Sequence, residues 1–594
     1  MQRARPVSRG CRAPGDATIG STEDPRLPRV DSEMSDPAEA RSEDLATTPG
    51  SEHAEAASEA PAITQGEAPA RASERGPSLA VRLREPGWYV ALSVAVVAML
   101  VYLPTLMPGI AFGDWGEMAT VPHVLGVAHP TGYPTYIVMA WLAELLPIGS
   151  IAFRANLLSA VYVTVTLVTL SLISLRLGVR PVIAIAGALA TGAIGTIWAA
   201  ATVSEVNPLH LMFVALVVHR ALVWSDRRKR SDLVLGGLLI GLALGNHLLM
   251  LFVAPFVVLF VLGAGRRELL ARPWLLLLAG AAGLLGLSVY VYIPLAALRN
   301  PVLPYNHPTT LDGVIWLVSG TQFRGQFDFL AGEGPGDFVA ALPTLWSLIL
   351  ERATIVVPIL AALGLVRLTW QRPAFGLMCI GIMVTAMYIW ANYQELEHYL
   401  LVPWLIAGIG LSVGVESLAR LLGALVDWAG AGGEHSSAHR ISTAVAGLAG
   451  LAFVVTLGSL NWATNDQSGD ESGPDYVDAV FASLPANAAI LSYWDASTPL
   501  WYGQHVEGLR PDVLIVDDTN IVYENWGTRE ARIASLICSR PVFIERLGDG
   551  DLVPTREQYQ LEPFLTVNVA AGGPSAVTET EIYRVLPLPS NPCP

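Results

Sequence analysis

The stretch GIAFGDWGEMATVPHVLGVAHPTGYPTY, Gly109–Tyr136, follows directly on the first long apolar segment of the chain, residues 88–108. It contains no Lys or Arg, but it carries four ionisable side chains: Asp114, Glu117, His123 and His129. Such groups are costly to keep near lipid, and beside a membrane segment they usually mark a functional site. The fold therefore depends on whether the chain around this stretch crosses a membrane.

The composition is typical of a polytopic membrane protein with soluble parts attached. Of 594 residues, 52% are hydrophobic and 15% charged, and the mean hydropathy is +0.47. The net charge of −15 is uneven, because residues 1–80 hold 14 acids against 9 Arg and residues 461–594 hold 19 acids against 7 Arg. The acidity lies outside the apolar region, which argues against nucleic acid as a partner.

Eleven segments are apolar enough to be interpreted as membrane spans. They are 88–108, 153–175, 181–200, 207–224, 232–245, 247–264, 274–297, 345–366, 374–391, 399–421 and 441–460. With the N-terminus in the cytoplasm, the even-numbered loops carry most of the Lys and Arg, as the positive-inside rule requires. The pattern predicts a multi-pass protein of the plasma (inner) membrane with an extracytoplasmic C-terminus.

Two apolar runs need separate interpretation. The segment 134–147 is short and contains Glu144, so we expect an interfacial or half-inserted helix within a first external loop, 109–152. The run 232–264 has Arg-rich ends on both sides and must cross twice, which predicts a hairpin that turns at Asn246 and His247. Its first arm is short, and short helices with polar tips often line a cavity.

The two ends of the chain differ in character. Residues 1–85 are rich in Ala, Glu, Ser and Pro, and we expect a disordered cytoplasmic tail; whether 1–80 is part of the mature protein stays open. Residues 86–460 form the predicted membrane domain. Residues 461–594 alternate helical and strand patterns, which predicts a small extracytoplasmic α/β domain with a partly parallel sheet. Cys538 and Cys593 could pair there, and no Cys/His spacing indicates zinc.

Polar residues gather on the external side in this topology. They are Asp114, Glu117, His123, His129, Glu205, Asn207, His210, Asn246, His247, Arg324, Glu395, Glu397 and His398. Each has a structural alternative: Asn207 before Pro208 suits a helix cap, and Glu397 and His398 could bond to each other. The convergence, rather than any single residue, predicts a site.

Three motifs carry a resemblance to a known family: Asp114-Trp115-Gly116-Glu117, His129-Pro130-Thr131-Gly132-Tyr133-Pro134 and Phe153-Arg154-Ala155-Asn156-Leu157-Leu158-Ser159. They resemble the signature of a membrane-protein family, the domain of unknown function 2723 or transmembrane protein 260-like family. That family is similar to the protein O-mannosyltransferases, multi-span glycosyltransferases of the GT-C type. Two departures stand out: Asn207 replaces an expected aromatic residue, and YWDAS at 493–497 replaces an acidic run.

The resemblance implies a polyprenyl-phosphate sugar donor, an extracytoplasmic site and a catalytic acid in the first external loop. We expect Asp114 to be the general base, with Glu117 orienting it or serving as the alternative base. Arg154 and Arg324 are candidates to stabilise the leaving phosphate. Expected substrate-binding residues also include His129, Tyr133, Glu205, Asn207, Asn246, His247, Glu397 and His398. No cofactor is required, although a divalent cation held by the acids stays open.

Two other functions compete with this interpretation. A transporter or flippase for a polyprenyl-linked sugar would use the same polar residues to bind a moving substrate, but the chain has no evident internal repeat of spans. A receptor or scaffold would leave the acids unexplained. The sequence identifies neither the sugar nor the acceptor, which could be a protein hydroxyl, a glycan or a lipid, and it is silent on oligomeric state.

Overall fold

The computed structural model describes residues 87–322, 336–392, 397–429, 435–523, 527–570 and 577–589. The predicted tail 1–85, Arg324, Glu395 and Cys593 lie outside the described residues, so the Cys538–Cys593 pairing stays a prediction. Cys379 is a free thiol buried within a helix.

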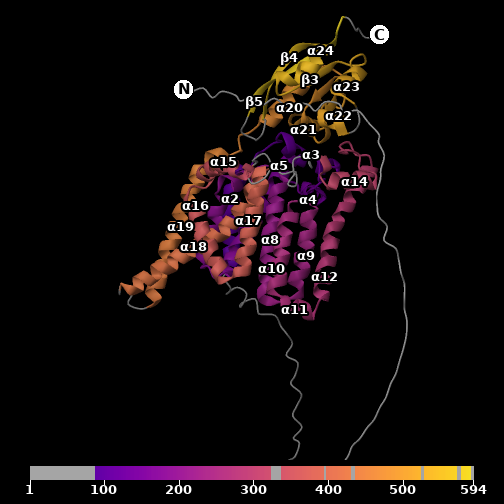
Figure 1. Ribbon diagram of the computed structural model, residues 1–594. Helices are drawn as coiled ribbons and strands as arrows, with labels where there is room; N and C mark the ends of the chain where they lie inside the picture. Colours follow the sequence, from indigo (N-terminus) through magenta and orange to yellow (C-terminus); the bar gives the residue numbers. More distant parts are fainter. Residues whose placement is uncertain are drawn as a thin grey trace, which may run out of the picture. The chain divides into compact units, whose positions relative to one another are not determined.

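Most of the described chain is helical (Figure 1). Before the C-terminal sheet the helices are α2 (Gly87–Tyr102), α3 (Gly113–Val124), α4 (Pro134–Glu144), α5 (Ile151–Arg176), α6 (Pro181–Gly192), α7 (Gly195–Ala199), α8 (Val206–Arg227), α9 (Arg230–Leu244), α10 (Met250–Ala264), α11 (Arg266–Ala271), α12 (Trp274–Leu287), α13 (Tyr292–Leu298), α14 (Leu311–Val318), α15 (Gly336–Arg352), α16 (Val356–Gln371), α17 (Pro373–Asn392), α18 (Leu401–Trp428) and α19 (His435–Asn465). Short 3-10 turns are η1 (Leu103–Thr105), η2 (Ser288–Val291) and η4 (Glu397–Leu400).

By length and composition, seven helices of the described residues could cross a membrane, or up to eight if a bent pair is one span. The polytopic helical class is confirmed, but the count of eleven spans is not. Predicted spans at 181–200, 232–245 and 247–264 are helices of 15 residues or fewer, because Gly and polar residues end them early. The expected hairpin turn at Asn246 and His247 falls between α9 and α10.

The predicted span 345–366 is not one continuous helix. α15 and α16 are separated by three residues and bent by 106°. At the break, Thr354 has a positive φ of 62°, which a helix interior does not allow. The carbonyl of Arg352 accepts from Asn461 Nδ2 over 2.9 Å instead of continuing the helix.

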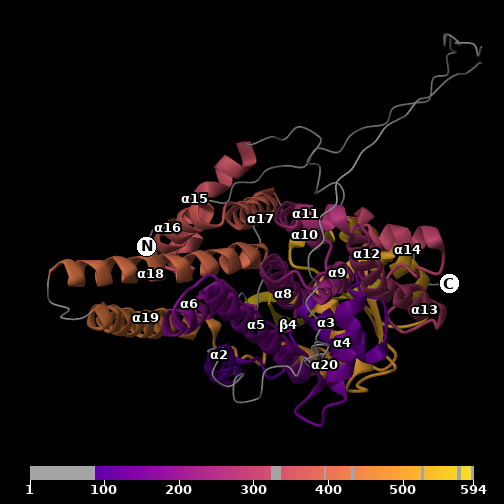
Figure 2. The ribbon, with the colours of Figure 1, turned by 90° about the horizontal axis from the view of Figure 1, so that it is seen from below.

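Glycines set the closest helix contacts. On α9, a Cβ at Gly237 would lie 2.1 Å from the carbonyl oxygen of Ala279 on α12, and one at Gly241 would lie 2.0 Å from that of Gly283. Their spacing of four residues puts both on one face, as in small-xxx-small membrane interfaces. α8 and α18 are largely buried, while α12 and α19 lie on opposite flanks (Figure 2).

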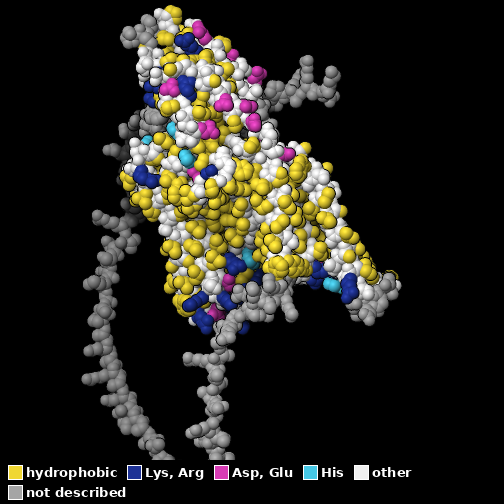
Figure 3. All heavy atoms as spheres, turned by 180° about the vertical axis from the view of Figure 1, so that it is seen from behind, with side chains coloured by type: hydrophobic (Ala, Val, Ile, Leu, Met, Phe, Trp, Pro, Cys, Tyr) yellow, Lys and Arg dark blue, Asp and Glu magenta, His cyan; other side chains and the backbone are white. Residues whose placement is uncertain are grey.

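On the face shown in Figure 3, hydrophobic side chains form a broad belt over the helices. Lys and Arg gather at the end of the belt away from the C-terminal sheet, whereas acidic side chains lie over the sheet itself. A large exposed apolar surface is expected where a membrane protein contacts lipid.

The C-terminal residues form a five-stranded sheet of order β2-β1-β3-β5-β4. Its strands are β1 (Ala489–Ser492), β2 (Leu514–Asp517), β3 (Val542–Glu545), β4 (Tyr559–Ala570) and β5 (Val577–Pro587), with helices α20 (Ser472–Ser483), α21 (Trp494–His505), α22 (Asp518–Tyr523), α23 (Arg529–Leu536) and α24 (Val553–Gln558) and the turn η5 (Asp549–Leu552). β1 pairs in parallel with β2 and β3, and β5 antiparallel with β3 and β4. The structure therefore contains the partly parallel sheet. α19 extends to Asn465, past the predicted domain boundary at 460/461.

Candidate functional site

Two acids lie on one face of α3. Asp114 and Glu117 are three residues apart, which in a helix makes them neighbours. Both face His129: Glu117 is hydrogen-bonded to it, and Asp114 Oδ2 lies 3.8 Å from its Nε2. The predicted helical arrangement of these two acids is thus confirmed.

His129 is buried and held on three sides. Its backbone N–H donates to Glu117 Oε1 over 2.9 Å, its Nδ1 bonds to Glu117 Oε2, and its Nε2 lies 3.0 Å from the Tyr133 hydroxyl. Burial alone would lower the pKa of His129, but the carboxylates of Glu117 and Asp114 outweigh it and raise the pKa to about 9. These charges favour the protonated ring at neutral pH. Tyr133 then accepts from Nε2 and donates to the carbonyl of Pro130, over 3.0 Å.

Asp114 is the accessible carboxylate of this group. Its side chain is 52% exposed, against 2% for Glu117. Trp494 Nε1 donates to Asp114 Oδ1 over 2.7 Å, and the Trp494 ring lies edge-on to His129, with centroids 5.6 Å apart. One oxygen of Asp114 is thus oriented by an indole N–H and the other by an imidazolium. This arrangement leaves the carboxylate open to a substrate.

Two glycines, Gly113 just before the first motif and Gly116 within it, explain how Trp494 reaches Asp114. A Cβ at Gly113, where φ is +60°, would lie 2.5 Å from Asp495 Oδ1, and one at Gly116 would lie 2.6 Å from Thr498 Oγ1. Any larger residue at either position would push α3 away from α21. Burial and the charge of Asp114 raise the pKa of Asp495 to about 6.

Further predicted residues surround this centre. The rings of Tyr133 and His247 have centroids 5.9 Å apart, and those of His247 and His210 are 5.6 Å apart. Glu205 is buried within electrostatic reach of Asp114 and His129; burial, and then Asp114, raise its pKa to about 7. The structure brings these residues together as the sequence predicted.

Glu397 and His398, just before α18, have different partners. Glu397 accepts from Arg352 Nη2 over 2.9 Å and from Thr196 Oγ1 over 3.3 Å. His398 is half-buried against Tyr399 and within electrostatic reach of Asp114. His398 therefore belongs to the cluster, whereas Glu397 neutralises an arginine beside it.

Arg154 does not face the cluster. Its guanidinium donates to three backbone carbonyls, those of Glu144, Ile148 and Gly149. Three of its five N–H groups thus bind the turn between α4 and α5, and a role of Arg154 in stabilising the phosphate stays a prediction. His123 likewise pairs with Glu144, at 3.0 Å, instead of with the site.

The asparagines have structural roles. The predicted cap at Asn207 is wrong: α8 begins at Val206, and Glu205 caps it by accepting from the N–H of Val206 over 2.8 Å and of Asn207 over 3.4 Å. The cap thus lies two residues earlier than expected. Asn246 Nδ2 donates to the carbonyl of Val206 over 3.0 Å and ties the α9–α10 turn to α8.

Among the described residues, Asp114, Glu117 and His129 offer ligand atoms within 4.8 Å of one another and could hold a metal ion. A metal would need His129 neutral, however, because only an unprotonated imidazole nitrogen can ligate. The two carboxylates favour the protonated ring instead. The geometry suits an ion pair at least as well as a metal site.

Trp494 was missed from the sequence. It is the first residue of α21, two positions after the carboxyl end of the parallel strand β1, where ligands bind in open α/β sheets. The departure from the family pattern at 493–497 pointed to this segment. Only the fold shows that it contacts Asp114.

The fold and this site together define a class. ArnT from Cupriavidus metallidurans has the same fold: its apo structure and its complex with undecaprenyl phosphate each match with a TM-score of 0.51 and 14% identity, covering 84% of this chain and 97% and 98% of those chains. The chain therefore has the polytopic helical membrane fold of these two structures.

The comparison with sequence families is more specific. Residues 114–269 match the family model of the protein O-mannosyl-transferase TMEM260 N-terminal domain. Over 477 residues the chain is 28% identical to protein O-mannosyl-transferase TMEM260 of Mus musculus, covering 74% of this chain and 63% of that protein. The relative in Dictyostelium discoideum is 24% identical over 515 residues, covering 79% of this chain and 61% of that protein. The chain thus resembles protein O-mannosyl-transferases and spans less than two thirds of their length.

Proposed function

We propose that the protein is a glycosyltransferase that moves a sugar from a polyprenyl-phosphate donor to a hydroxyl acceptor on the extracytoplasmic side. The observation that carries this proposal is the oriented, exposed carboxylate of Asp114. The names of the relatives and the lipid phosphate bound by ArnT support the class of reaction.

In the proposed reaction, the acceptor oxygen attacks C1 of the sugar while Asp114 takes the hydroxyl proton. The C1–O bond to the phosphate breaks, and the polyprenyl phosphate leaves with the bonding electrons. Proton transfer to a positioned carboxylate contributes typically ~10²–10⁴-fold in rate. Glu117 is buried and bonded to His129, so we assign it a positioning role.

We assign donor binding to the more deeply buried residues of the same cluster. His129, Tyr133, Glu205, His247 and His398 would face the sugar and phosphate, with the His129 imidazolium nearest the reacting centre. No metal is needed in this scheme, because the phosphate is already a fair leaving group. We therefore expect EDTA to leave transfer unchanged. Loss of activity restored by Mg²⁺ or Mn²⁺ would instead assign Asp114, Glu117 and His129 to a cation.

The decisive experiment compares purified wild type with Asp114→Asn on a panel of polyprenyl-phosphate sugars. Both transfer to acceptors and hydrolysis of the donor would be measured. We expect Asp114→Asn to lose ~10²-fold or more of both activities while it stays folded. Asp312→Asn, an exposed acid at the first turn of α14, is the matched control. A wild type that binds donor without consuming it would favour a transporter or flippase.

A further inference from the structure

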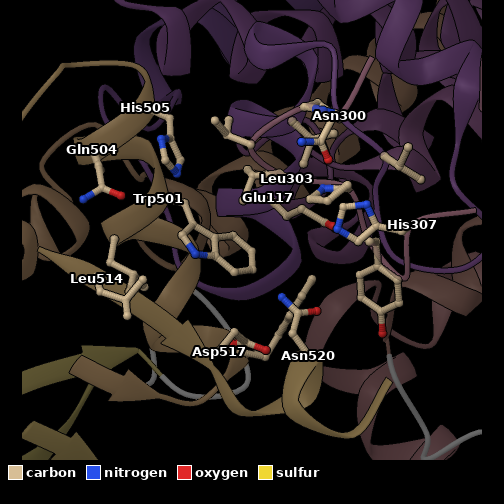
Figure 4. Close-up of a pocket in the computed structure, with 18 of the residues that line it drawn as sticks. Glu117, Asn300, Leu303, His307, Trp501, Gln504, His505, Leu514, Asp517 and Asn520 are labelled. Carbon is tan, nitrogen blue, oxygen red and sulfur yellow. The ribbon is translucent and has the colours of Figure 1, made fainter. Parts of the chain in front are cut away.

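Two cavities formed by the described residues differ in place and in lining. The first, of about 380 Å³, is lined by Glu117 and Trp494 among others and adjoins the candidate site (Figure 4). The second, of about 780 Å³, lies between α6 and α19, which pack side by side (Figure 2), and it shares no residue with the first. The second cavity is therefore a separate feature that the proposed reaction does not use.

Small residues bring α6 and α19 together along one line and leave a groove beside it. A Cβ at Gly447 would lie 3.0 Å from Val182 Cγ2, and one at Gly450 would lie 2.8 Å from Ala186 Cβ. The apolar walls of the groove are Val182, Ile185, Ala186 and Leu189 of α6 and Ala444, Leu448, Leu451 and Val454 of α19, none of which is buried. The volume is in the range of small-ligand sites, and this lining suits a hydrocarbon chain.

The groove has the depth of one membrane leaflet. α19 is long and apolar enough to cross a membrane, and its lining residues extend from His439 to Val454. These fifteen steps cover about 22 Å at a rise of about 1.5 Å per residue. Half of a bilayer, headgroups included, is about 20–22 Å thick. A single lipid lying along α19 would therefore fill the groove.

The end of the groove away from the C-terminal sheet is basic. Arg440 lines it, is exposed, and forms no ion pair within the described residues. Thr443, also in the lining, accepts from Arg180 Nη1 over 2.7 Å. Glu416 is shared by Arg180 and Arg420, over 2.9 and 2.7 Å, so it neutralises only one of these two charges. Basic pockets between membrane helices bind anionic lipid headgroups.

We propose that this groove binds one anionic phospholipid of the leaflet that faces away from the C-terminal sheet. The phosphate lies at Arg440, and one acyl chain lies along α19 toward Val454. A neutral lipid would fill the groove but would leave the charge of Arg440 unpaired. The polyprenyl donor does not fit, because its phosphate must reach Asp114 on α3, at the opposite end of the helices (Figure 1). Such a lipid would bind whether or not the protein transfers sugar.

Native mass spectrometry of the full chain in detergent would test the headgroup. The probes are a phosphatidylglycerol and a phosphatidylcholine with the same acyl chains. We expect Arg440→Gln to weaken phosphatidylglycerol binding about fivefold, the contribution of one arginine near an anionic lipid, and to leave phosphatidylcholine unchanged. Arg266→Gln, at an exposed arginine of α11 outside the groove, is the matched control. Equal phosphatidylglycerol affinities in both variants and wild type would overturn the proposal.

A second pair of variants tests the apolar part of the groove. Ala444→Trp places an indole ring inside it, whereas Ala449→Trp adds the same ring to an exposed position of α19 outside it. We expect Ala444→Trp alone to weaken binding of both lipids, by about tenfold, because the acyl chain loses buried CH₂ groups. Thermal unfolding without added lipid would verify that both variants are folded.

Two results of this second comparison contradict the lipid site. Wild-type affinity of Ala444→Trp for both lipids would show that the acyl chain does not lie in the groove. A change in oligomeric mass, with lipid binding intact, would instead assign the groove to an interface between copies of the chain.

Discussion

At the scale of single residues, the site is an acid–imidazolium–acid arrangement with one exposed end. Glu117 is buried under His129, and Asp114 reaches the surface on the other side. The two carboxylates therefore have different roles despite their similar positions on α3. Environment, rather than residue type, distinguishes the proposed base from the positioning acid.

Trp494→Phe tests the orientation of Asp114. Phe keeps most of the ring but loses the N–H that donates to Asp114 Oδ1. Hydrogen bonds to charged groups are worth about 1.5–3 kcal/mol, so we expect kcat to fall by ~10–100-fold. Steady-state kinetics with a saturating donor would measure this fall. A change in KM alone would show that Trp494 serves binding only.

At the scale of elements, close packing positions the site. Gly113 and Gly116 bring α3 against α21, and the N–H of Ala152 at the start of α5 donates to the Tyr502 hydroxyl of α21 over 3.0 Å. The segment that carries Asp114 is thus clamped between the membrane helices and the C-terminal sheet. Replacing either glycine should separate Trp494 from Asp114.

The α9–α12 interface offers a matched pair of substitutions. Gly237→Ala places a Cβ 2.1 Å from the carbonyl oxygen of Ala279, whereas a Cβ at Gly236 meets nothing within 4 Å. We expect Gly237→Ala to destabilise the protein by about 1–3 kcal/mol. Gly236→Ala should be neutral or stabilise by about 0.5–1 kcal/mol, because Ala favours the helix. Thermal unfolding in detergent would compare them, and equal midpoints would contradict the close packing.

The cap of α8 gives a second prediction at this scale. Glu205→Gln keeps an oxygen that can accept from Val206 and Asn207, but it removes the charge near Asp114. Glu205→Ala removes both and should cost about 0.5–2 kcal/mol of stability. We expect Glu205→Gln to stay as stable as wild type in thermal unfolding. A loss as large as that of the Ala variant would mean that the carboxylate charge, not the cap, stabilises this helix.

At the scale of the whole molecule, the sheet and the membrane helices share the site. Asp114 on α3 and Trp494 on α21 are 380 positions apart in the chain. The described residues belong to one compact unit, 76–594.

The stability of the C-terminal sheet should depend on pH through Glu545. Burial raises the pKa of Glu545 from 4.5 to about 7, partly opposed by the hydrogen bond from Tyr476. The folded state therefore keeps a proton that the unfolded chain releases near pH 4.5. This contribution to stability is greatest below pH 4.5 and is lost as pH rises through 7.

The matching variant is Glu545→Gln, which can still accept from Tyr476. The shift corresponds to about 3 kcal/mol between the two limits. We expect the unfolding midpoint of wild type to fall between about pH 5 and pH 8 relative to that of Glu545→Gln. A constant difference between the unfolding midpoints of the two proteins across this pH range would show that Glu545 is not protonated in the folded protein.

The sequence by itself determined the helical membrane class, the α9–α10 hairpin, the strands β1 to β3 and the gathering of acids and histidines. These follow from local apolar periodicity and from the cost of placing charges near lipid. Both can be judged from the order of residue types along the chain. Only the tertiary structure decided that α15 and α16 bend apart, that Arg154 serves a turn, that Glu205 caps α8 and that Trp494 orients Asp114. The bend and the contact of Trp494 depend on partners distant in sequence, which local patterns do not specify. The bonds of Arg154 and Glu205 are local, but they depend on side-chain conformations that only the folded chain fixes.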